Sequence, residues 1–116
     1  EIQVDSEKNI DIATAISGSG PAYIFLFLQT LINSATSLGL DKAVAKKISV
    51  ETVLGSAYLA RNQSKSLKEL IEMVTSPGGT TEAGISVLKS KGFSSLVNSA
   101  VLSAYKRGIE ISKGKK

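Results

Sequence analysis

A stretch that is apolar on nearly every side constrains this chain more than any other feature. Residues 21–32 read Pro-Ala-Tyr-Ile-Phe-Leu-Phe-Leu-Gln-Thr-Leu-Ile. A helix on the surface of a monomer keeps one polar face, and this segment would have none. It is also shorter than the roughly 20 apolar residues that a membrane-spanning helix needs, so we expect no contact with a membrane. We therefore expect other protein segments to surround this helix.

Two arrangements would surround it: a central helix in the core of a monomer, or a helix wrapped by a second subunit. A chain of 116 residues has the size of one domain with a single core. The few helices of such a domain leave few neighbours to cover a whole cylinder, whereas a second copy doubles them. The sequence therefore favours an obligate homodimer with interleaved helices, and the monomeric arrangement stays open.

The pattern of caps and breakers predicts an all-α fold. Asp11 is predicted to cap a short helix that ends near Ile16, because residues 17–20 read Ser-Gly-Ser-Gly. Ser19 would cap the next helix, which continues to about Leu38 and ends before a left-handed Gly39.

Later helices have similar signals. Asp41 is a predicted N-cap, and Ser66 with Glu69 has the spacing of a capping box. Thr80 or Thr81 is predicted to cap the helix that follows a Pro-Gly-Gly loop. These later helices are expected at about 42–61, 67–74, 81–91 and 94–113.

The composition excludes several classes of function. The chain has no cysteine and no histidine, which removes disulfides, thiolate nucleophiles, imidazole bases and the usual zinc sites, and we expect no metal site. A balance of 14 Lys and Arg to 10 Asp and Glu, with three tyrosines, three phenylalanines and no tryptophan, does not indicate nucleic-acid binding. Residues 1–10 have no signal-peptide pattern and read as the remnant of an interdomain linker, so we expect a cytoplasmic protein whose domain spans 11–116.

Residues 75–81, Thr-Ser-Pro-Gly-Gly-Thr-Thr, are the richest candidate for a binding site. Two glycines let the backbone turn its N–H groups inward, hydroxyls stand beside them, and the positive end of a helix dipole follows. The loop lacks the lysine of a triphosphate-binding loop, so an anion such as a carboxylate or a single phosphate fits it better. An ordinary helix connector is the alternative.

Residues 17–22, Ser-Gly-Ser-Gly-Pro-Ala, begin like a dinucleotide-binding fingerprint. The third glycine of the fingerprint is replaced by Tyr23, and no hydrophobic strand precedes the turn. We therefore interpret this segment as a flexible turn with exposed amides that a ligand can approach closely, or as simple helix capping.

The two loops together identify a resemblance. The residues that carry it are Ser17-Gly18-Ser19-Gly20-Pro21-Ala22-Tyr23, Gly39-Leu40, Thr52-Val53-Leu54-Gly55, Val74-Thr75-Ser76-Pro77-Gly78-Gly79-Thr80-Thr81 and Gly92-Phe93. Their order and spacing across about 11–113 resemble the C-terminal dimerisation domain of pyrroline-5-carboxylate reductases.

The resemblance implies a fold, an activity and partners. The fold would be an interleaved helical dimer similar to the C-terminal domain of 6-phosphogluconate dehydrogenase. The family reduces L-1-pyrroline-5-carboxylate to L-proline with NADPH or NADH, the last step of proline biosynthesis. An N-terminal Rossmann domain, absent from this chain, would bind most of the nucleotide. Dimers of the family often assemble into decamers.

The resemblance also implies roles for individual residues. Ser76, Gly78, Gly79, Thr80 and Thr81 would hold the substrate carboxylate, with Thr81 also near the imine nitrogen as the catalytic residue. Ser19, Gly20 and Pro21 would line the nicotinamide side of the pocket. Two departures stand out, because Ser64-Lys65-Ser66 replaces a common Glu-His-Pro and Ile71-Glu72 replaces a common Lys-Asp. The first puts in doubt a contact from that position to the substrate amine.

Two other functions remain possible at this point. The chain could be a free-standing helical module that forms homo-oligomers without a ligand, or a domain of a related reductase that acts on another cyclic imine. If it is the reductase domain, we expect it to be inactive by itself, because the hydride donor has no binding site within these residues.

Overall fold

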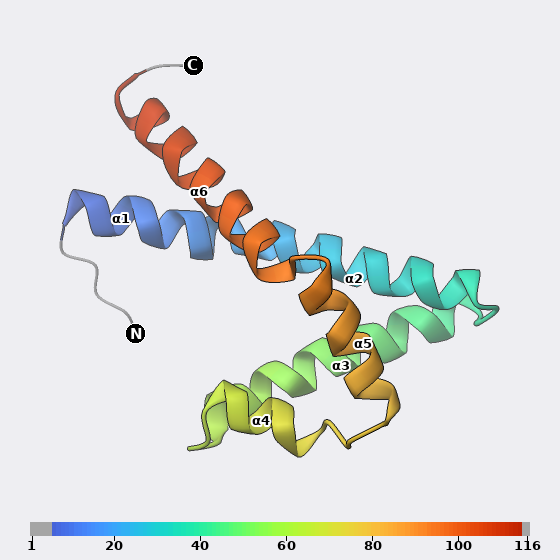
Figure 1. The fold of residues 1–116 in the computed structure, drawn as a ribbon. Helices are drawn as coiled ribbons and strands as arrows, with labels where there is room; N and C mark the ends of the chain where they lie inside the picture. Colours follow the sequence, from blue (N-terminus) through green and yellow to red (C-terminus); the bar gives the residue numbers. More distant parts are fainter. Residues whose placement is uncertain (1–5, 115–116) are drawn as a thin grey trace. The chain divides into compact units, whose positions relative to one another are not determined.

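The computed structural model describes residues 6–114, which are helical apart from short turns and contain no strand (Figure 1). This confirms the all-α prediction. The elements are α1 (Glu7–Ala13), η1 (Thr14–Gly18), α2 (Gly20–Ser37), α3 (Lys42–Asn62), α4 (Leu67–Met73), α5 (Thr80–Ser90) and α6 (Phe93–Ser112).

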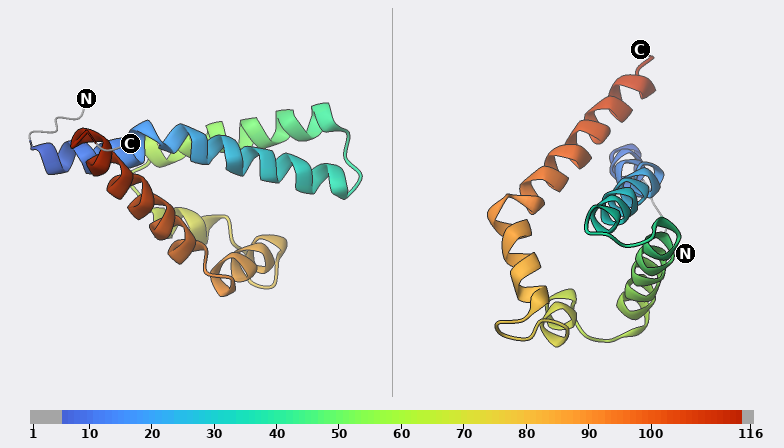
Figure 2. Two further views of the ribbon diagram at one scale, coloured as in Figure 1. Left: turned by 90° about the horizontal axis from the view of Figure 1, so that it is seen from above. Right: turned by 90° about the vertical axis from the view of Figure 1, so that its right-hand side faces the viewer.

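These elements belong to two compact units. The first ends at Ile24 and resumes at Lys89, and the second is Phe25–Leu88. Within the first unit, α1 and η1 pack against α6. Within the second, the part of α2 that begins at Phe25 is followed by α3, which returns from the turn that joins them (Figure 2), and side chains of both helices line one groove.

Local signals end and begin most helices where the sequence predicts. Gly39 has φ 108°, and the N–H groups of Leu40 and Gly39 donate to the carbonyls of Ala35 and Thr36 at 3.0 Å each. These two bonds form a Schellman motif, which requires a left-handed residue. The Asp41 carboxylate accepts hydrogen bonds from the next helix, which confirms it as an N-cap.

The first helix begins earlier than expected. Ser6 is its N-cap, because the Ser6 hydroxyl accepts a hydrogen bond from the Asn9 N–H at 3.1 Å. The predicted start at Asp11 is therefore wrong, and Glu7–Ile10 of the expected linker are helical. The remainder of that linker, residues 1–5, lies outside the described residues.

The predicted break at residues 17–20 is also wrong. The chain stays helical there by widening into the π-helix η1, in which the Ser19 N–H donates to the Thr14 carbonyl at 3.1 Å. Ser19 has helical dihedrals, φ −89° and ψ −23°, and not the extended backbone of an N-cap. A π-turn admits one extra residue while the chain stays helical, and Pro21 follows where its missing N–H is tolerated.

Very little of the described chain is buried. Among residues 6–114, Ala15, Ala45 and Ser49 are the buried side chains. On α2, the successive residues Phe25, Leu26 and Phe27 are 67%, 64% and 42% exposed, although steps of about 100° point them in different directions. The helix that was expected to be surrounded is therefore not covered within one copy of the chain.

The continuous helical segment is longer than the apolar stretch from which no membrane contact was expected. Glu7–Ser37 is long and apolar enough to cross a membrane by length and composition. A core helix of a soluble protein passes the same test of length and composition.

Candidate functional site

The loop between α4 and α5 is a tight turn built by its proline and glycines. Pro77 and Gly78 occupy the centre of a turn in which the Gly79 N–H donates to the Ser76 carbonyl at 3.0 Å. Gly78 has φ 72°, the left-handed conformation that a type II turn requires at its third residue. The sequence motif therefore determines this turn locally.

Gly79 is needed because the backbone approaches itself closely. A Cβ atom added at Gly79 would lie 3.2 Å from the Ser76 carbonyl oxygen. The second glycine of the pair thus allows the turn to close directly onto the start of α5.

The helix α5 begins one residue earlier than its predicted caps allow. Thr80 is the first helical residue, and the Ala83 N–H donates to the Gly79 carbonyl at 3.2 Å. Gly79 is therefore in the N-cap position, and the prediction that Thr80 or Thr81 caps the helix is wrong. The amides of Thr80 and Thr81 precede the first helical hydrogen bond and lie at the positive end of the helix dipole. Both residues are exposed.

Glu82, which the sequence reasoning missed, changes the electrostatics of this loop. Its carboxylate Oε1 accepts a hydrogen bond from the Gly78 N–H at 2.9 Å. Two of the amides expected to hold an anion are therefore engaged inside the protein: Gly78 with Glu82, and Gly79 with Ser76. The signal was present in the sequence, since Glu82 follows the N-cap Gly79 by three residues, as in a capping box.

The upstream end of the loop is tied back to α4. The Thr75 hydroxyl donates to the Ile71 carbonyl, and the Thr75 N–H donates to the Glu72 carbonyl at 3.2 Å. Thr75 is half-buried, whereas Ser76 is exposed. The hydroxyl of Thr75 therefore anchors the loop. The other hydroxyls of the motif belong to the exposed residues Ser76, Thr80 and Thr81.

The helix before this loop carries the departure from the family pattern. Ser66, in the segment 64–66, is the N-cap of α4, and its N–H donates to Glu69 Oε1 at 2.9 Å while its hydroxyl accepts from the Glu69 N–H at 3.1 Å. This reciprocal pair confirms the predicted capping box. The hydrogen bonds from the Ser66 backbone and side chain lower the pKa of Glu69 below its ordinary value.

The turn expected to contact the cofactor lies in the first unit. The carbonyl of Ser19 accepts from the Ala22 N–H at 3.0 Å, and its own N–H is bonded to Thr14. Pro21 has no N–H to offer. The prediction of a flexible turn is therefore wrong, because residues 14–18 are helical and the π-turn uses the Ser19 amide. Ser19 and Gly20 are half-buried, and Pro21 is exposed.

Tyr23 supports this turn from the following helix. Its hydroxyl donates to the Ala15 carbonyl at 3.3 Å, in a part-buried position. In the sequence, Tyr23 stands where a nucleotide fingerprint would have its third glycine. The hydrogen bond shows what its side chain does instead.

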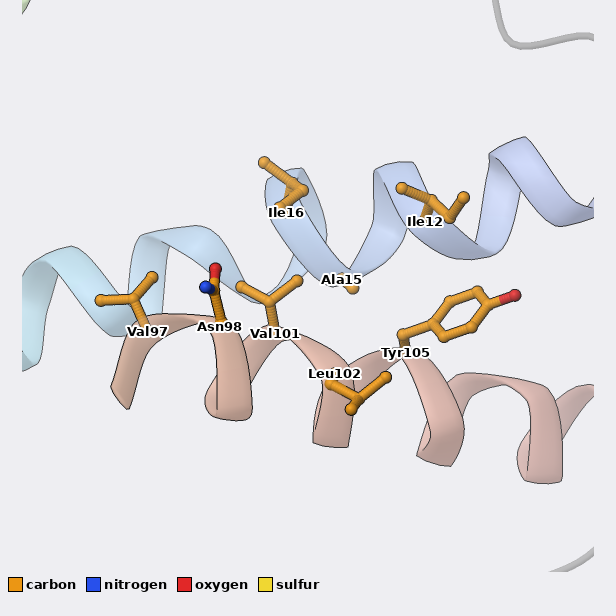
Figure 3. A pocket seen from close by; sticks show the side chains of 8 residues that line it. All are labelled: Ile12, Ala15, Ile16, Val97, Asn98, Val101, Leu102 and Tyr105. Carbon is orange, nitrogen blue, oxygen red and sulfur yellow. The ribbon is translucent and has the colours of Figure 1, made fainter. Parts of the chain in front are cut away.

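Each unit also presents an open apolar groove. In the first unit, residues of α1 and η1 face α6 across a groove that Figure 3 shows from close by, lined by Ile12, Ala15, Ile16, Val97, Asn98, Val101, Leu102 and Tyr105. In the second unit, α2 and α3 line another with Phe25, Leu28, Gln29, Ile32, Asn33, Lys42, Lys46 and Val50. Both grooves expose aliphatic or aromatic side chains that a single copy does not cover.

Comparison with known proteins gives a consistent result. Residues 7–111 match the family model described as pyrroline-5-carboxylate reductase dimerisation. Pyrroline-5-carboxylate reductase from Synechocystis sp. is 42% identical over 107 residues, and that from Pseudomonas aeruginosa is 41% identical over 110. The matches cover 92% and 95% of this chain, respectively, and 40% of each relative. The chain thus spans about two-fifths of the length of these relatives.

Solved structures of the same kind share the fold. A pyrroline-5-carboxylate reductase from Coxiella burnetii superposes with a TM-score of 0.92 at 43% identity, covering 99% of this chain and 42% of that one. The Plasmodium falciparum pyrroline carboxylate reductase, solved with NADP bound, has a TM-score of 0.86 at 36% identity, covering 89% of this chain and 41% of that one.

Proposed function

The chain belongs to the pyrroline-5-carboxylate reductase dimerisation family, and we propose that it is the helical part of an enzyme that reduces L-1-pyrroline-5-carboxylate to L-proline with NADPH or NADH. In this proposal the domain has two tasks, which are to join two subunits and to hold the substrate carboxylate. A cytoplasmic location, expected from the sequence, is part of the same proposal.

The near-absence of a buried core in one copy is the observation that carries the first task. Almost all large apolar side chains of α2 and α6 remain partly or fully exposed, and hydrophobic surface of this extent is stable in water only when something covers it. A second copy supplies complementary helices by symmetry. We therefore propose an obligate homodimer, with decamers as a further level of assembly.

Sedimentation velocity or native mass spectrometry of the chain tests this assembly. The expected species is a dimer, or a multiple of dimers, at micromolar concentration. A stable, folded monomer at that concentration would contradict the proposal.

For the second task we propose that Ser76, Gly78, Gly79, Thr80 and Thr81 hold the carboxylate of the substrate. The exposed amides of Thr80 and Thr81, at the start of α5, support this proposal most directly, because helix N-termini attract anions. The hydroxyl of Thr81 would donate to the imine nitrogen and orient the ring. These are tasks of orientation and hydrogen bonding, for which neither histidine nor cysteine is needed.

The turn at Ser19, Gly20 and Pro21 fits only part of a nicotinamide cofactor. Its surface is uncharged and half-buried at Ser19 and Gly20, which suits contact with the nicotinamide ring. It offers few N–H donors to phosphates, because the Ser19 amide is bonded to Thr14 and Pro21 has none. When bound, the cofactor would supply the hydride, and a nucleotide domain outside this chain would hold its phosphates.

Titration of the ¹⁵N-labelled chain with L-proline tests the proposed carboxylate site. The Thr80 and Thr81 amides should shift in a saturable manner, because proline carries the carboxylate of the product. A helical module without a ligand, the alternative function, predicts no such shift. Adding a separately produced nucleotide domain of a relative should restore turnover, and a panel of cyclic imines would then separate this substrate from related ones.

A further inference from the structure

We infer that Glu82 sets the affinity of the α4–α5 loop for the substrate carboxylate, because it occupies the Gly78 amide in the ligand-free protein. This inference rests on the proposed function and adds a residue that determines affinity. Glu82 does not bind the substrate in this inference but competes with it.

The geometry places one carboxylate where another is expected. Glu82 Oε1 accepts from the Gly78 N–H at 2.9 Å, a distance typical of a charge-assisted hydrogen bond. The left-handed Gly78, φ 72°, turns this amide toward the first turn of α5, where Glu82 lies. The neighbouring Gly79 amide is already bonded to the Ser76 carbonyl, so Gly78 is the loop amide whose partner is a side chain that can move.

Two anions cannot use this donor together without a cost. A backbone amide has one hydrogen, and two carboxylates brought together repel one another. A substrate carboxylate that binds the Gly78 N–H must therefore displace Glu82, which is exposed and can rotate into solvent. If the substrate instead binds only the Thr80 and Thr81 amides, the fixed charge of Glu82 still opposes it.

The dependence on ligand charge separates this competition from a purely structural role. Removing a helix-capping carboxylate for structural reasons would affect all ligands alike through the loop's order. Removing a competing charge should help only ligands that carry a carboxylate. L-Proline and L-prolinamide share the ring and differ at that group, so they form a matched pair of probes.

The experiment measures the Kd of both probes by NMR for the chain and for the variants Glu82→Ala and Glu82→Gln. Glu51→Gln, an exposed glutamate on α3, is the control for the change in net charge. We expect the Kd of L-proline to fall roughly five-fold in Glu82→Ala, the scale of one exposed charge interaction. Glu82→Gln should show a smaller decrease, because its amide oxygen can still accept from Gly78. The Kd of L-prolinamide should not fall in either variant.

The possible failures are distinguishable. L-Proline binding to the chain with the same or a higher Kd in both Glu82 variants would overturn this inference and leave the proposed carboxylate site intact. Absence of L-proline binding in every protein would overturn the proposed site together with the inference. An equal decrease in the Kd of L-prolinamide in the Glu82 variants would also overturn the inference. Circular dichroism of Glu82→Gln, which preserves the shape of the side chain, checks that the fold is intact.

Discussion

The hydroxyl of Tyr23 donates to the carbonyl of Ala15 at 3.3 Å, so a side chain of α2 holds the π-helix that precedes it. Ala15 is 2% exposed, and its small side chain lies where η1 faces α6 (Figure 3). The bond therefore connects the packing of the first unit with the turn proposed to contact the nicotinamide.

Replacing Tyr23 with Phe should lower the free energy of unfolding by about 1 kcal/mol, the net value of one hydrogen bond. The aromatic ring remains, and only the hydroxyl and its bond to Ala15 are lost. Urea denaturation followed by circular dichroism measures the difference. Tyr58→Phe is the matched control, because Tyr58 is 66% exposed and should be close to neutral. Equal stability of the two variants would show that the bond does not contribute.

Gly39→Ala should lower the free energy of unfolding by about 1–2 kcal/mol, the cost of a left-handed backbone for a residue with a Cβ atom. Nothing lies within 4 Å of a Cβ at this position, so the cost comes from φ 108° and not from a steric clash. Gly39→Asn should cost less, because asparagine tolerates positive φ. Thermal denaturation of both variants checks this order, and an alanine variant as stable as the asparagine variant would contradict it.

The Ser66–Glu69 capping box should make the stability of α4 depend on acid pH. Because folding lowers the pKa of Glu69, its stabilisation is complete above the unfolded pKa, about 4.3, and is lost as the pH falls through the lower folded pKa. A carbon-detected NMR titration should give a folded pKa below that value. In Ser66→Ala the pKa should rise only part of the way back, because the backbone hydrogen bond is the larger cause. Ser64→Ala, two residues before, should leave it unchanged.

Phe25→Lys should weaken the proposed dimer. Phe25 is 67% exposed in one copy, and replacing a buried Phe in an apolar interface costs about 3–5 kcal/mol of binding free energy, which corresponds to a dimer Kd roughly 10²- to 4 × 10³-fold higher. Sedimentation equilibrium over a concentration series measures this, with Lys68→Ala on α4 as a control. A variant that dissociates or unfolds on dilution agrees with the proposal, and one with the mass of the unaltered protein at every concentration contradicts it.

Sequence reasoning succeeded where one residue and its near neighbours settle the structure. Gly39, Asp41 and Ser66 act through bonds to backbone groups no more than four residues away, so their types and spacing were sufficient. It failed at Ser19 and Gly79. At these two positions the helix boundary depends on which of several adjacent acceptors bonds to the N–H groups at the start of the helix. Ser19 lost its predicted capping role because a π-turn satisfied the backbone without it.

The candidate site was likewise predictable from the sequence only in part. The type II turn at Pro77 and Gly78 follows from the motif, whereas the bond from Gly78 to Glu82 was not anticipated. An anion cradle was inferred from donors alone, but the effective number of donors depends on the acceptors that the folded chain brings beside them.

The sequence by itself determined that this chain is helical, where most of its helices end, and that α2 cannot remain in water without cover, because hydrophobic pattern and capping are properties of short segments. Only the tertiary structure decided which distant segments meet, with α1 and η1 packing against α6, and that one copy buries so little. Burial and hydrogen-bond partners depend on which groups meet in space, and the order of residues along a helix does not specify that.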